Sequence, residues 1–312
     1  MSTGSAGRVT RTTPWLPRRA GTERGDGGTL RTALRAADGV SVDALYEPGP
    51  QGVDGPAIVL AHGFTGDLER PHVRRAAAVL ARYASVVTFT FRGHGKSGGR
   101  STVGDREVLD LAAAVSWARG LGHARVVTVG FSMGGSVALR HAALHRVEAA
   151  AEPGEGRTDA AAAEPCEGRT DAYADAVVAV SAPARWYYRG TAPMRRLHWL
   201  VTRRSGRVVG RHVLRTRIHP REWDPVPLSP VEAVPLIAPT PLLIVHGDRD
   251  PYFPLDHPRM LADAAGGSAE LWLEPGMGHA ENAAGEELLA RIASWATGFS
   301  TGWAGWDAEH GY

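Results

Sequence analysis

Short apolar runs alternate with stretches of helical periodicity through most of this chain, and this alternation limits its fold more than any other feature. The first run, PAIVLAHGF at Pro56–Phe64, is short and almost continuously apolar, as strands buried on both faces are. Segments such as RPHVRRAAAVLARYA carry apolar residues at helical spacing between the runs. Strands that alternate with helices predict an α/β protein with a mainly parallel central sheet flanked by helices. The other apolar runs are SVVTFTFRGHG (85–95), RVVTVGF (125–131), DAVVAVSAP (175–183), PLLIVHGDRDPYFP (241–254) and AELWLEPGMGHA (269–280).

The chain divides into one core and three additions. Residues 1–28 are rich in Gly, Thr and Arg without periodicity, and we expect a flexible N-terminal arm there. The α/β core is predicted at 29–182 and 236–312, and it begins with a hairpin around Asp38-Gly39. Residues 183–235 are too many for a simple connection, and their apolar residues recur at helical spacing. We therefore expect a small arginine-rich helical cap in that segment.

A tandem repeat interrupts the predicted core at 149–173. AAEPGEGRTDA (150–160) is followed by AAEPCEGRTDA (162–172), and the copies differ only at Gly154 and Cys166. Two copies are too few for a solenoid, so we interpret the repeat as a surface loop lengthened by duplication. Cys166 is the only cysteine and cannot form an internal disulfide, and we interpret it as a bystander thiol.

A serine lies between two glycines where a strand gives way to a helix, in RVVTVGFSMGGSVALRHAALH (125–145). A tight turn there would lift Ser132 above the edge of the sheet, and the flanking glycines would let the turn form. The helix that follows points N–H groups and the positive end of its dipole at any negative charge formed nearby. G-x-S-x-G alone is a modest signal in a chain with 38 glycines, so its partners decide the interpretation.

A serine nucleophile needs an oxyanion-hole loop, a carboxylate and a histidine, and the sequence has a candidate for each at the expected place in the chain order. The loop LAHGFTG follows an earlier strand and would offer the N–H of Phe64, beside the N–H of Met133, as an oxyanion hole. The segment IVHGDRDPYFP supplies Asp250 as the carboxylate, whereas Asp248 is interpreted as a turn residue. The loop EPGMGHAEN supplies His279 last.

These residue types suit nucleophilic catalysis. A free serine hydroxyl is a weak nucleophile, and a neutral imidazole can take its proton and later deliver it to the leaving group. A carboxylate fixes the tautomer of the imidazole and stabilises the imidazolium. We therefore predict a catalytic triad of Ser132, His279 and Asp250.

With these motifs the chain resembles the α/β-hydrolase superfamily, in its serine-hydrolase (esterase/lipase-like) branch with a cap between the sixth and seventh strands. GFSMGG resembles the nucleophile elbow of that family, and FRGHGKSGG (Phe91–Gly99) resembles its R-G-H-G-x-S loop. The similarity covers about Leu30 to Ser300. It implies an enzyme that needs no cofactor and cleaves esters, thioesters, amides or lactones. We expect hydrolysis of a small-molecule carboxylic ester or thioester through an acyl-enzyme intermediate.

The same triad leaves other functions open. A cofactor-free perhydrolase or an acyltransferase would use it with a different acceptor, and a non-catalytic binding protein would keep the scaffold without the chemistry. Haloalkane dehalogenases and epoxide hydrolases, by contrast, would carry Asp at position 132. The sequence leaves the acyl chain length and the oligomeric state open, and it shows no zinc-ligand spacing and no P-loop.

Positive charge is concentrated in the predicted cap. Pro183–Arg221 holds eleven arginines and no Asp or Glu, although the formal net charge of the chain is only +2. Because Arg matches phosphates and carboxylates, one hypothesis is an anionic substrate, and anionic lipid heads are another. Nucleic acid is not an expected partner of a nearly neutral chain with a hydrolase site. Trp186 and Trp199 in the cap are candidate walls of a substrate pocket.

Several histidines receive structural interpretations. His62, His94 and His246 lie beside glycines at strand ends, and we expect them to brace the site loops. His141 and His145 lie four residues apart, and we expect a solvated helix face there rather than a metal pair. No apolar run approaches the roughly 20 residues of a membrane helix, and the N-terminal stretch lacks the apolar region of a secretory signal. The sequence therefore predicts a cytoplasmic protein.

Overall fold

The structure is a computed structural model that describes residues 22–146 and 171–298. Cys166 and most of the 149–173 insertion lie outside these residues, as does most of the predicted N-terminal arm. The described end of that arm forms the edge strand β1 (Glu23–Arg24) and the 3₁₀ helix η1 (Asp26–Gly28). These last residues of the arm therefore join the edge of the sheet.

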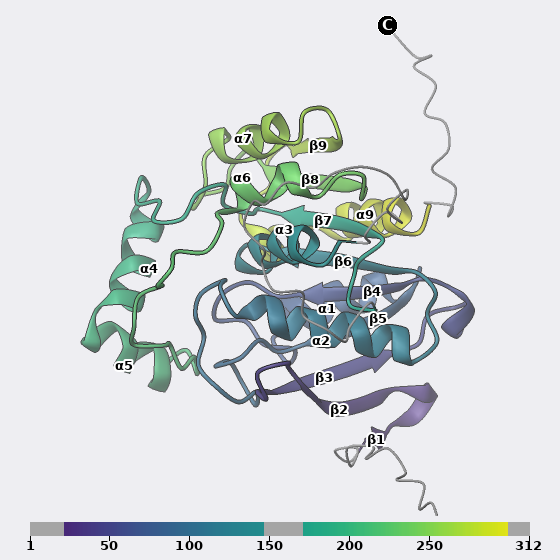
Figure 1. Ribbon diagram of the computed structural model, residues 1–312. Helices are drawn as coiled ribbons and strands as arrows, with labels where there is room; N and C mark the ends of the chain where they lie inside the picture. Colours follow the sequence, from purple (N-terminus) through teal and green to yellow (C-terminus); the bar gives the residue numbers. More distant parts are fainter. Residues whose placement is uncertain (1–21, 147–170, 299–312) are drawn as a thin grey trace, which may run out of the picture.

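In the described parts of the chain, nine strands form one sheet in the order β1-β2-β3-β5-β4-β6-β7-β8-β9 (Figure 1). The first three strands pair antiparallel and β3 pairs antiparallel with β5, whereas all the other neighbours are parallel. The α/β fold with a mainly parallel sheet, expected from the sequence, is therefore confirmed. The strands after β1 are β2 (Leu30–Arg35), β3 (Ser41–Glu47), β4 (Ala57–Ala61), β5 (Ser85–Phe89), β6 (Val126–Phe131), β7 (Ala176–Val180), β8 (Leu242–Gly247) and β9 (Ala269–Glu274).

Helices cover both faces of the sheet, which explains why its central strands are apolar throughout. α1 (Pro71–Leu80) and α9 (Glu286–Gly298) pack on one face. The other face is covered by α2 (Glu107–Gly120), α3 (Met133–Leu144) and α7 (Asp256–Ala264). All residues of β4 to β8 are buried. Because the carboxyl ends of parallel strands lie at one edge, the loops after β4, β6, β8 and β9 meet there.

A pair of helices projects from the body of the molecule between β7 and β8 (Figure 1). α4 (Ala192–Thr202) and α5 (Arg204–His212) pack against each other within the predicted cap segment 183–235. The end of that segment forms α6 (Pro230–Ala233) and leads into η3 (Val234–Leu236), and both pack against α3 and α7. If the two-residue β1 is left out of the count, β7 and β8 are the sixth and seventh strands. The remaining short helices are η2 (Gly52–Asp54) and α8 (Ala280–Ala283).

No helix in the described ranges is both long and apolar enough to span a lipid bilayer.

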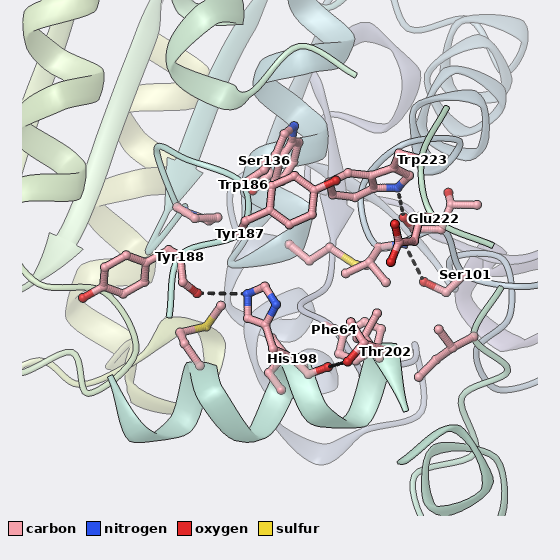
Figure 2. Close-up of a pocket in the computed structure, with 18 of the residues that line it drawn as sticks. Phe64, Ser101, Ser136, Trp186, Tyr187, Tyr188, His198, Thr202, Glu222 and Trp223 are labelled. Carbon is pink, nitrogen blue, oxygen red and sulfur yellow. Dashed lines mark hydrogen bonds between the residues drawn. The ribbon is translucent and has the colours of Figure 1, made fainter. Parts of the chain in front are cut away.

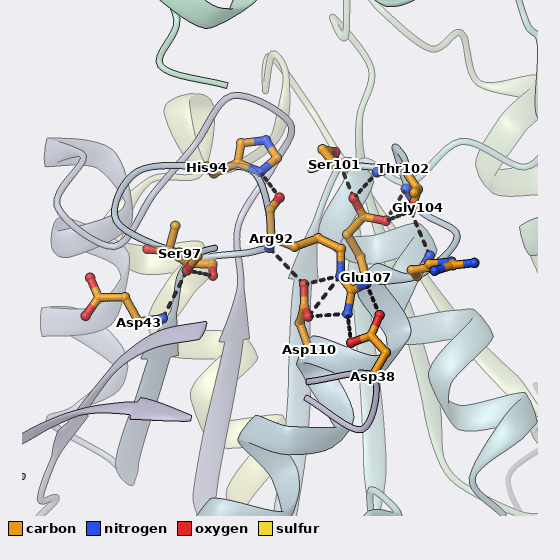
Figure 3. A network of polar contacts seen from close by, with 12 residues as sticks. Asp38, Asp43, Arg92, His94, Ser97, Ser101, Thr102, Gly104, Glu107 and Asp110 are labelled. Atoms are coloured by element: carbon orange, nitrogen blue, oxygen red, sulfur yellow. Dashed lines mark hydrogen bonds and ion pairs between the residues drawn. The ribbon is translucent and has the colours of Figure 1, made fainter. Parts of the chain in front are cut away.

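A buried network of charged groups fixes the loop after β5 (Figure 3). The Arg92 side chain, 3% exposed, contacts the fully buried carboxylate of Asp110 through Nε and Nη2 and reaches Asp38 through Nη1 at 2.6 Å. The N–H of Arg92 also donates to Asp110 at 2.8 Å. Nearby, the carboxylate of Glu107 accepts hydrogen bonds from four consecutive residues, 101–104. The carboxylates thus hold both ends of the same loop.

Replacing Arg92 is expected to destabilise the fold strongly. Arg92→Ala leaves the Asp110 carboxylate buried without its charge partner, which typically costs about 3–5 kcal/mol of unfolding free energy. Urea denaturation followed by circular dichroism measures this loss. The double variant Arg92→Ala, Asp110→Ala removes both charges and should recover part of it. A single variant within about 0.5 kcal/mol of the wild type would contradict the prediction.

Candidate active site

Ser132 occupies a strained turn between β6 and α3. Its φ of 52° and ψ of −114° form a backbone conformation that residues other than glycine rarely adopt. A Cβ at Gly130 would lie 2.2 Å from the carbonyl oxygen of Gly134, and a Cβ at Gly134 would lie 2.2 Å from that of Ala61. Close backbone contacts therefore require both glycines of the G-x-S-x-G motif. They let β6 turn sharply into α3 with Ser132 at the start of the helix.

Three side chains that are distant in the sequence meet at the carboxyl edge of the sheet. Oγ of Ser132 lies 2.9 Å from Nε2 of His279, and Nδ1 of His279 lies 2.7 Å from Oδ2 of Asp250. Because a carboxylate can only accept, the proton of a neutral imidazole lies on Nδ1, and Nε2 is left to accept from the hydroxyl of Ser132. Tyr252 stacks on the His279 ring with centroids 4.2 Å apart and limits its rotation.

Asp250 is buried and held as an ionised acceptor. Its side chain is 0% exposed, and Oδ1 accepts hydrogen bonds from the N–H groups of Tyr252 at 2.8 Å and Phe253 at 3.1 Å. Burial alone would raise the pKa of Asp250, but the hydrogen bonds from His279 and from these two N–H groups hold that pKa below its ordinary value. Asp248 lies in the exposed turn after β8, as expected, but its Oδ1 accepts from the N–H of Gly276 at 2.6 Å, in the loop after β9, and not from the backbone of its own turn.

The loop after β4 holds the Gly63–Phe64 peptide in one orientation. The carbonyl oxygen of Gly63 accepts from Nδ1–H of His62 at 2.7 Å and from the N–H of Gly66 at 3.0 Å. Nε2 of His62 accepts from the N–H of Phe91 at 3.0 Å, which leaves the proton on Nδ1. Burial lowers the pKa of His62 to about 3, so the ring is neutral near pH 7. Because C=O and N–H point in opposite directions across a trans peptide, the N–H of Phe64 points away from His62.

The two predicted oxyanion donors lie on either side of the serine. A Cβ at Gly63 would lie 3.5 Å from Cβ of Ser132, so the β4 loop lies directly against the nucleophile turn. Met133 is the first residue of α3, where an N–H has no partner within its own helix. Phe64, Met133 and Ser132 line one pocket. Among the described residues, no hydrogen-bond partner is found for the N–H of Phe64 or of Met133.

Comparison with protein families agrees with this geometry. The model of the alpha/beta hydrolase family matches residues 58–291, which is most of the chain. The chain belongs to the alpha/beta hydrolase family. No curated protein matches the chain.

Solved structures similar to this hydrolase include esterases. The esterase Pf2001 from Pyrococcus furiosus is 20% identical, with a TM-score of 0.60 over 93% of this chain and 98% of that one. Est1E from Butyrivibrio proteoclasticus, solved with ferulic acid bound, is 18% identical, with a TM-score of 0.52 over 84% and 96%. A serine hydrolase without a lid from Xanthomonas campestris is 18% identical, with a TM-score of 0.52 over 91% and 96%. At these identities the likeness shows the shared fold, and together with the family match it supports hydrolase activity.

A buried carboxylate that the sequence analysis did not identify links two loops of the hydrolase site. Glu281 is 3% exposed, and its Oε1 accepts from the N–H of Gly63 at 3.0 Å. Its own carbonyl oxygen accepts from Arg75 at 2.7 Å. Glu281 comes two residues after His279. Its hydrogen bond therefore joins the loop that carries His279 to the His62–Gly63 peptide in the loop after β4. A glutamate that follows the catalytic-histidine candidate in GHAEN is the only sequence signal of this link.

We expect Glu281 to act as a positioning residue. Glu281→Ala removes the acceptor for Gly63 N–H and should lower kcat/KM on a water-soluble ester by about 10–100-fold, less than the 10²–10³-fold typical of deleting an oxyanion donor. Glu281→Gln keeps an Oε1 acceptor and should stay within about threefold of the wild type. Steady-state kinetics measure both variants. Equal losses in the two variants would show that charge, rather than this hydrogen bond, matters.

Three histidines of this hydrolase hold loops, as the sequence predicts. His62 acts within the β4 loop. Nε2 of His94 accepts from the N–H of Thr65 at 3.2 Å, which links the loops after β4 and β5. Nε2 of His246 donates to the carbonyl oxygen of Phe253 at 2.9 Å, beside Asp250.

The interpretation of His141 is wrong. Its side chain is 0% exposed, whereas a solvated helix face was expected. The ring stacks on His145 with centroids 4.6 Å apart. The physical reason is that position 141 lies two turns after Gly134, on the side of α3 that faces the sheet, next to Ala172 in the segment that leads into β7.

Ser132 lines a pocket of about 480 Å³. Figure 2 shows this pocket from close by. Trp186, Tyr187 and Trp223 form an aromatic wall, in which the Trp223 ring centroid lies 5.1 Å from that of Trp186 and 5.5 Å from that of Tyr187. The expectation that Trp186 walls the pocket is therefore confirmed. The same expectation for Trp199 is wrong, because this side chain is 47% exposed and does not line the pocket.

Much of the remaining wall of the pocket comes from the cap and from the loop after β5. α4 contributes the apolar side chains of Met194, Leu197 and Val201 and the polar side chains of His198 and Thr202. Residues 101–103, which Glu107 holds, close the other side. The pocket thus has the hydroxyl of Ser132 at one place and a mainly aromatic and aliphatic wall around it.

Proposed function

We propose that this protein is a serine hydrolase that cleaves a carboxylic ester or thioester. The observation that carries the proposal is the pair of hydrogen bonds, 2.9 Å and 2.7 Å long, that joins Ser132 to His279 and His279 to Asp250 beside an apolar pocket. A serine, an imidazole and a carboxylate in this order form the arrangement that activates a hydroxyl for attack on a carbonyl.

Each residue of the site has one role in the proposed reaction. Nε2 of His279 takes the proton as Oγ of Ser132 attacks the carbonyl carbon, and Asp250 stabilises the imidazolium that forms. The N–H groups of Phe64 and Met133 stabilise the oxyanion. His279 then gives its proton to the leaving alcohol or thiol, and an acyl-enzyme remains on Ser132. Water, activated by the same imidazole, releases the acid and restores the serine.

The pocket favours an ester with an apolar or aromatic group. Trp186, Tyr187 and Trp223 offer ring faces, and α4 offers aliphatic side chains. Hydrophobic burial of such a group would supply binding energy without a charged partner. An anionic substrate stays a prediction, as does a cytoplasmic location. Arg189, Arg207 and Arg221 line the pocket and could meet an anionic group there.

Covalent trapping tests the proposal. A fluorophosphonate should react with the wild-type protein, and peptide mass spectrometry should place the adduct on Ser132. An aromatic p-nitrophenyl ester should give a burst of p-nitrophenol followed by steady turnover, as an acyl-enzyme predicts. Folded protein that is neither labelled nor active would overturn the proposal and favour a non-catalytic binding protein on this scaffold.

A further inference from the structure

The outer face of α4 combines arginines with an exposed tryptophan. Arg195, Arg196, Trp199 and Arg203 are all exposed, and their spacing places them on one side of the helix. Trp199 is 47% exposed, although tryptophan is normally well buried. The opposite side of the same helix carries the residues that line the substrate pocket.

α5 and the residue after it repeat this combination. Val208 is 58% exposed and Val213 is 70% exposed. Arg204 and Arg211 lie one turn before and one turn after Val208, and Arg215 follows Val213; all three are exposed. Apolar and cationic side chains therefore alternate along the exposed part of this segment.

α4 and α5 form one tightly packed hairpin. A Cβ at Gly206 would lie 2.4 Å from the carbonyl oxygen of Trp199, so the two backbones touch at this glycine. We define the cap surface as the following exposed residues of the hairpin and of the segment after it: Arg195, Arg196, Trp199, Arg203, Arg204, Val208, Arg211, Val213 and Arg215. Close packing presents these side chains on a rigid support.

The positive charge of the cap is almost uncompensated. Of the eleven arginines of 183–221, only Arg185 pairs with a carboxylate of the described residues, that of Asp256 at 3.0 Å. Outside the cap, buried and half-buried arginines pair with carboxylates, for example Arg92 with Asp110 and Arg119 with Asp175. The cap surface therefore offers guanidinium groups that have no carboxylate partner among the described residues, around exposed apolar side chains.

We propose that the cap surface docks this protein onto an anionic lipid bilayer. Arginines are attracted to anionic head groups, while Trp and Val side chains gain by entering the boundary between head groups and acyl chains. Trp suits this depth because its ring is apolar and its N–H is polar. Exposed valines would gain nothing from a nucleic-acid backbone, which argues for lipid as the partner. A second consequence rests on the proposed function: an ester drawn from the bilayer would enter beside α4, whose inner face lines the pocket.

Vesicle cosedimentation of the full chain tests the docking. Vesicles of phosphatidylcholine mixed with phosphatidylglycerol should bind the protein, vesicles of phosphatidylcholine alone should bind it much more weakly, and salt should reduce the difference. The variant Arg196→Gln, Arg203→Gln, Arg204→Gln, Arg211→Gln should bind at least about tenfold more weakly, because each charge near the surface is worth about fivefold. The control Arg35→Gln, Arg259→Gln removes exposed arginines on β2 and α7, and it should stay within about twofold of the wild type.

The apolar part of the surface has its own test. Trp199→Ala with Val208→Ser removes exposed apolar area and should weaken binding to anionic vesicles about tenfold or more. Brominated lipids should quench the fluorescence of the wild type more than that of Trp199→Phe. If Trp199→Ala with Val208→Ser binds as well as the wild type, or if the protein binds a DNA duplex as tightly as anionic vesicles, the proposal is overturned.

Docking and catalysis can be separated. All cap-surface variants should hydrolyse a water-soluble ester like the wild type, because none of the changed residues lines the pocket. Ser132→Ala should bind anionic vesicles like the wild type, because it leaves the cap surface intact. Failure of ester hydrolysis alone would therefore count against the proposed function, and failure of vesicle binding alone would count against the docking.

Discussion

Ser132→Ala should lower kcat/KM for ester hydrolysis at least about 10⁴-fold, because it removes the atom that would form the acyl-enzyme. His279 and Asp250 stay in place, but without the hydroxyl the imidazole has no nucleophile to deprotonate. The oxyanion donors and the pocket would still supply the small remaining rate. Labelling by a fluorophosphonate should disappear with the activity. Hydrolysis of an aromatic p-nitrophenyl ester measures the loss.

Ser136→Ala is the matched control for this change. Ser136 lies one turn further along α3 and lines the same pocket, but within the described part of the chain its hydroxyl bonds only to the carbonyl oxygen of Ser132, at 3.5 Å. Its activity should stay within about threefold of the wild type. Thermal melting of both variants should match the wild type within a few degrees, which separates loss of chemistry from loss of fold. Full activity in Ser132→Ala would mean that another group is the nucleophile.

The sequence predicts the sheet well because its signal is local. Buried parallel strands must be apolar along their whole length, and β4 to β8 lie within the apolar runs. α7 is less visible, because Pro258 lies at its third residue and resembles a helix breaker. Proline is tolerated there since N–H groups of the first turn have no partner within the helix. Position within the helix, which the sequence does not mark, decides the effect of this proline.

The site is predictable to a different degree in each of its parts. Ser132, Asp250 and His279 carry motifs with fixed neighbours, and the structure brings the three side chains into contact. Glu281 has no such motif, since its role depends on the N–H of Gly63, 218 residues away in the chain. Contacts between residues so far apart in the chain are set by packing of the whole fold. The spacing of apolar residues in the sequence does not indicate them.

The exposed tryptophan illustrates the same limit. Trp186 and Trp199 are both apolar residues of the predicted cap, and the sequence treats them alike. Trp186 enters the pocket, where its Nε1–H donates to the carbonyl oxygen of Pro227 at 3.0 Å. Trp199 lies on the outer side of α4 instead. Trp186 lies in the loop before α4, whereas Trp199 lies on α4 itself. How the hairpin sits on the core decides which side of α4 faces the pocket, and this orientation leaves Trp199 facing solvent.

Asp250→Asn should lower kcat about 10⁴-fold near neutral pH while changing KM little. The amide oxygen can still accept from the N–H groups of Tyr252 and Phe253, so the amide nitrogen should face His279 and donate to Nδ1. The proton of the neutral imidazole would then lie on Nε2, which could no longer accept from the Ser132 hydroxyl. KM should hold because Asp250 does not line the pocket.

Asp248→Asn tests whether the effect of Asp250→Asn is specific. Asp248 lies two residues earlier and is exposed, and its side chain accepts from the N–H of Gly276 in the loop after β9. The same loss of charge at this position should leave kcat within about threefold of the wild type. Equal losses at the two positions would point to a general electrostatic effect of the loop. A large loss at Asp250 alone would mean that the tautomer of one imidazole, fixed by one buried carboxylate, controls the rate.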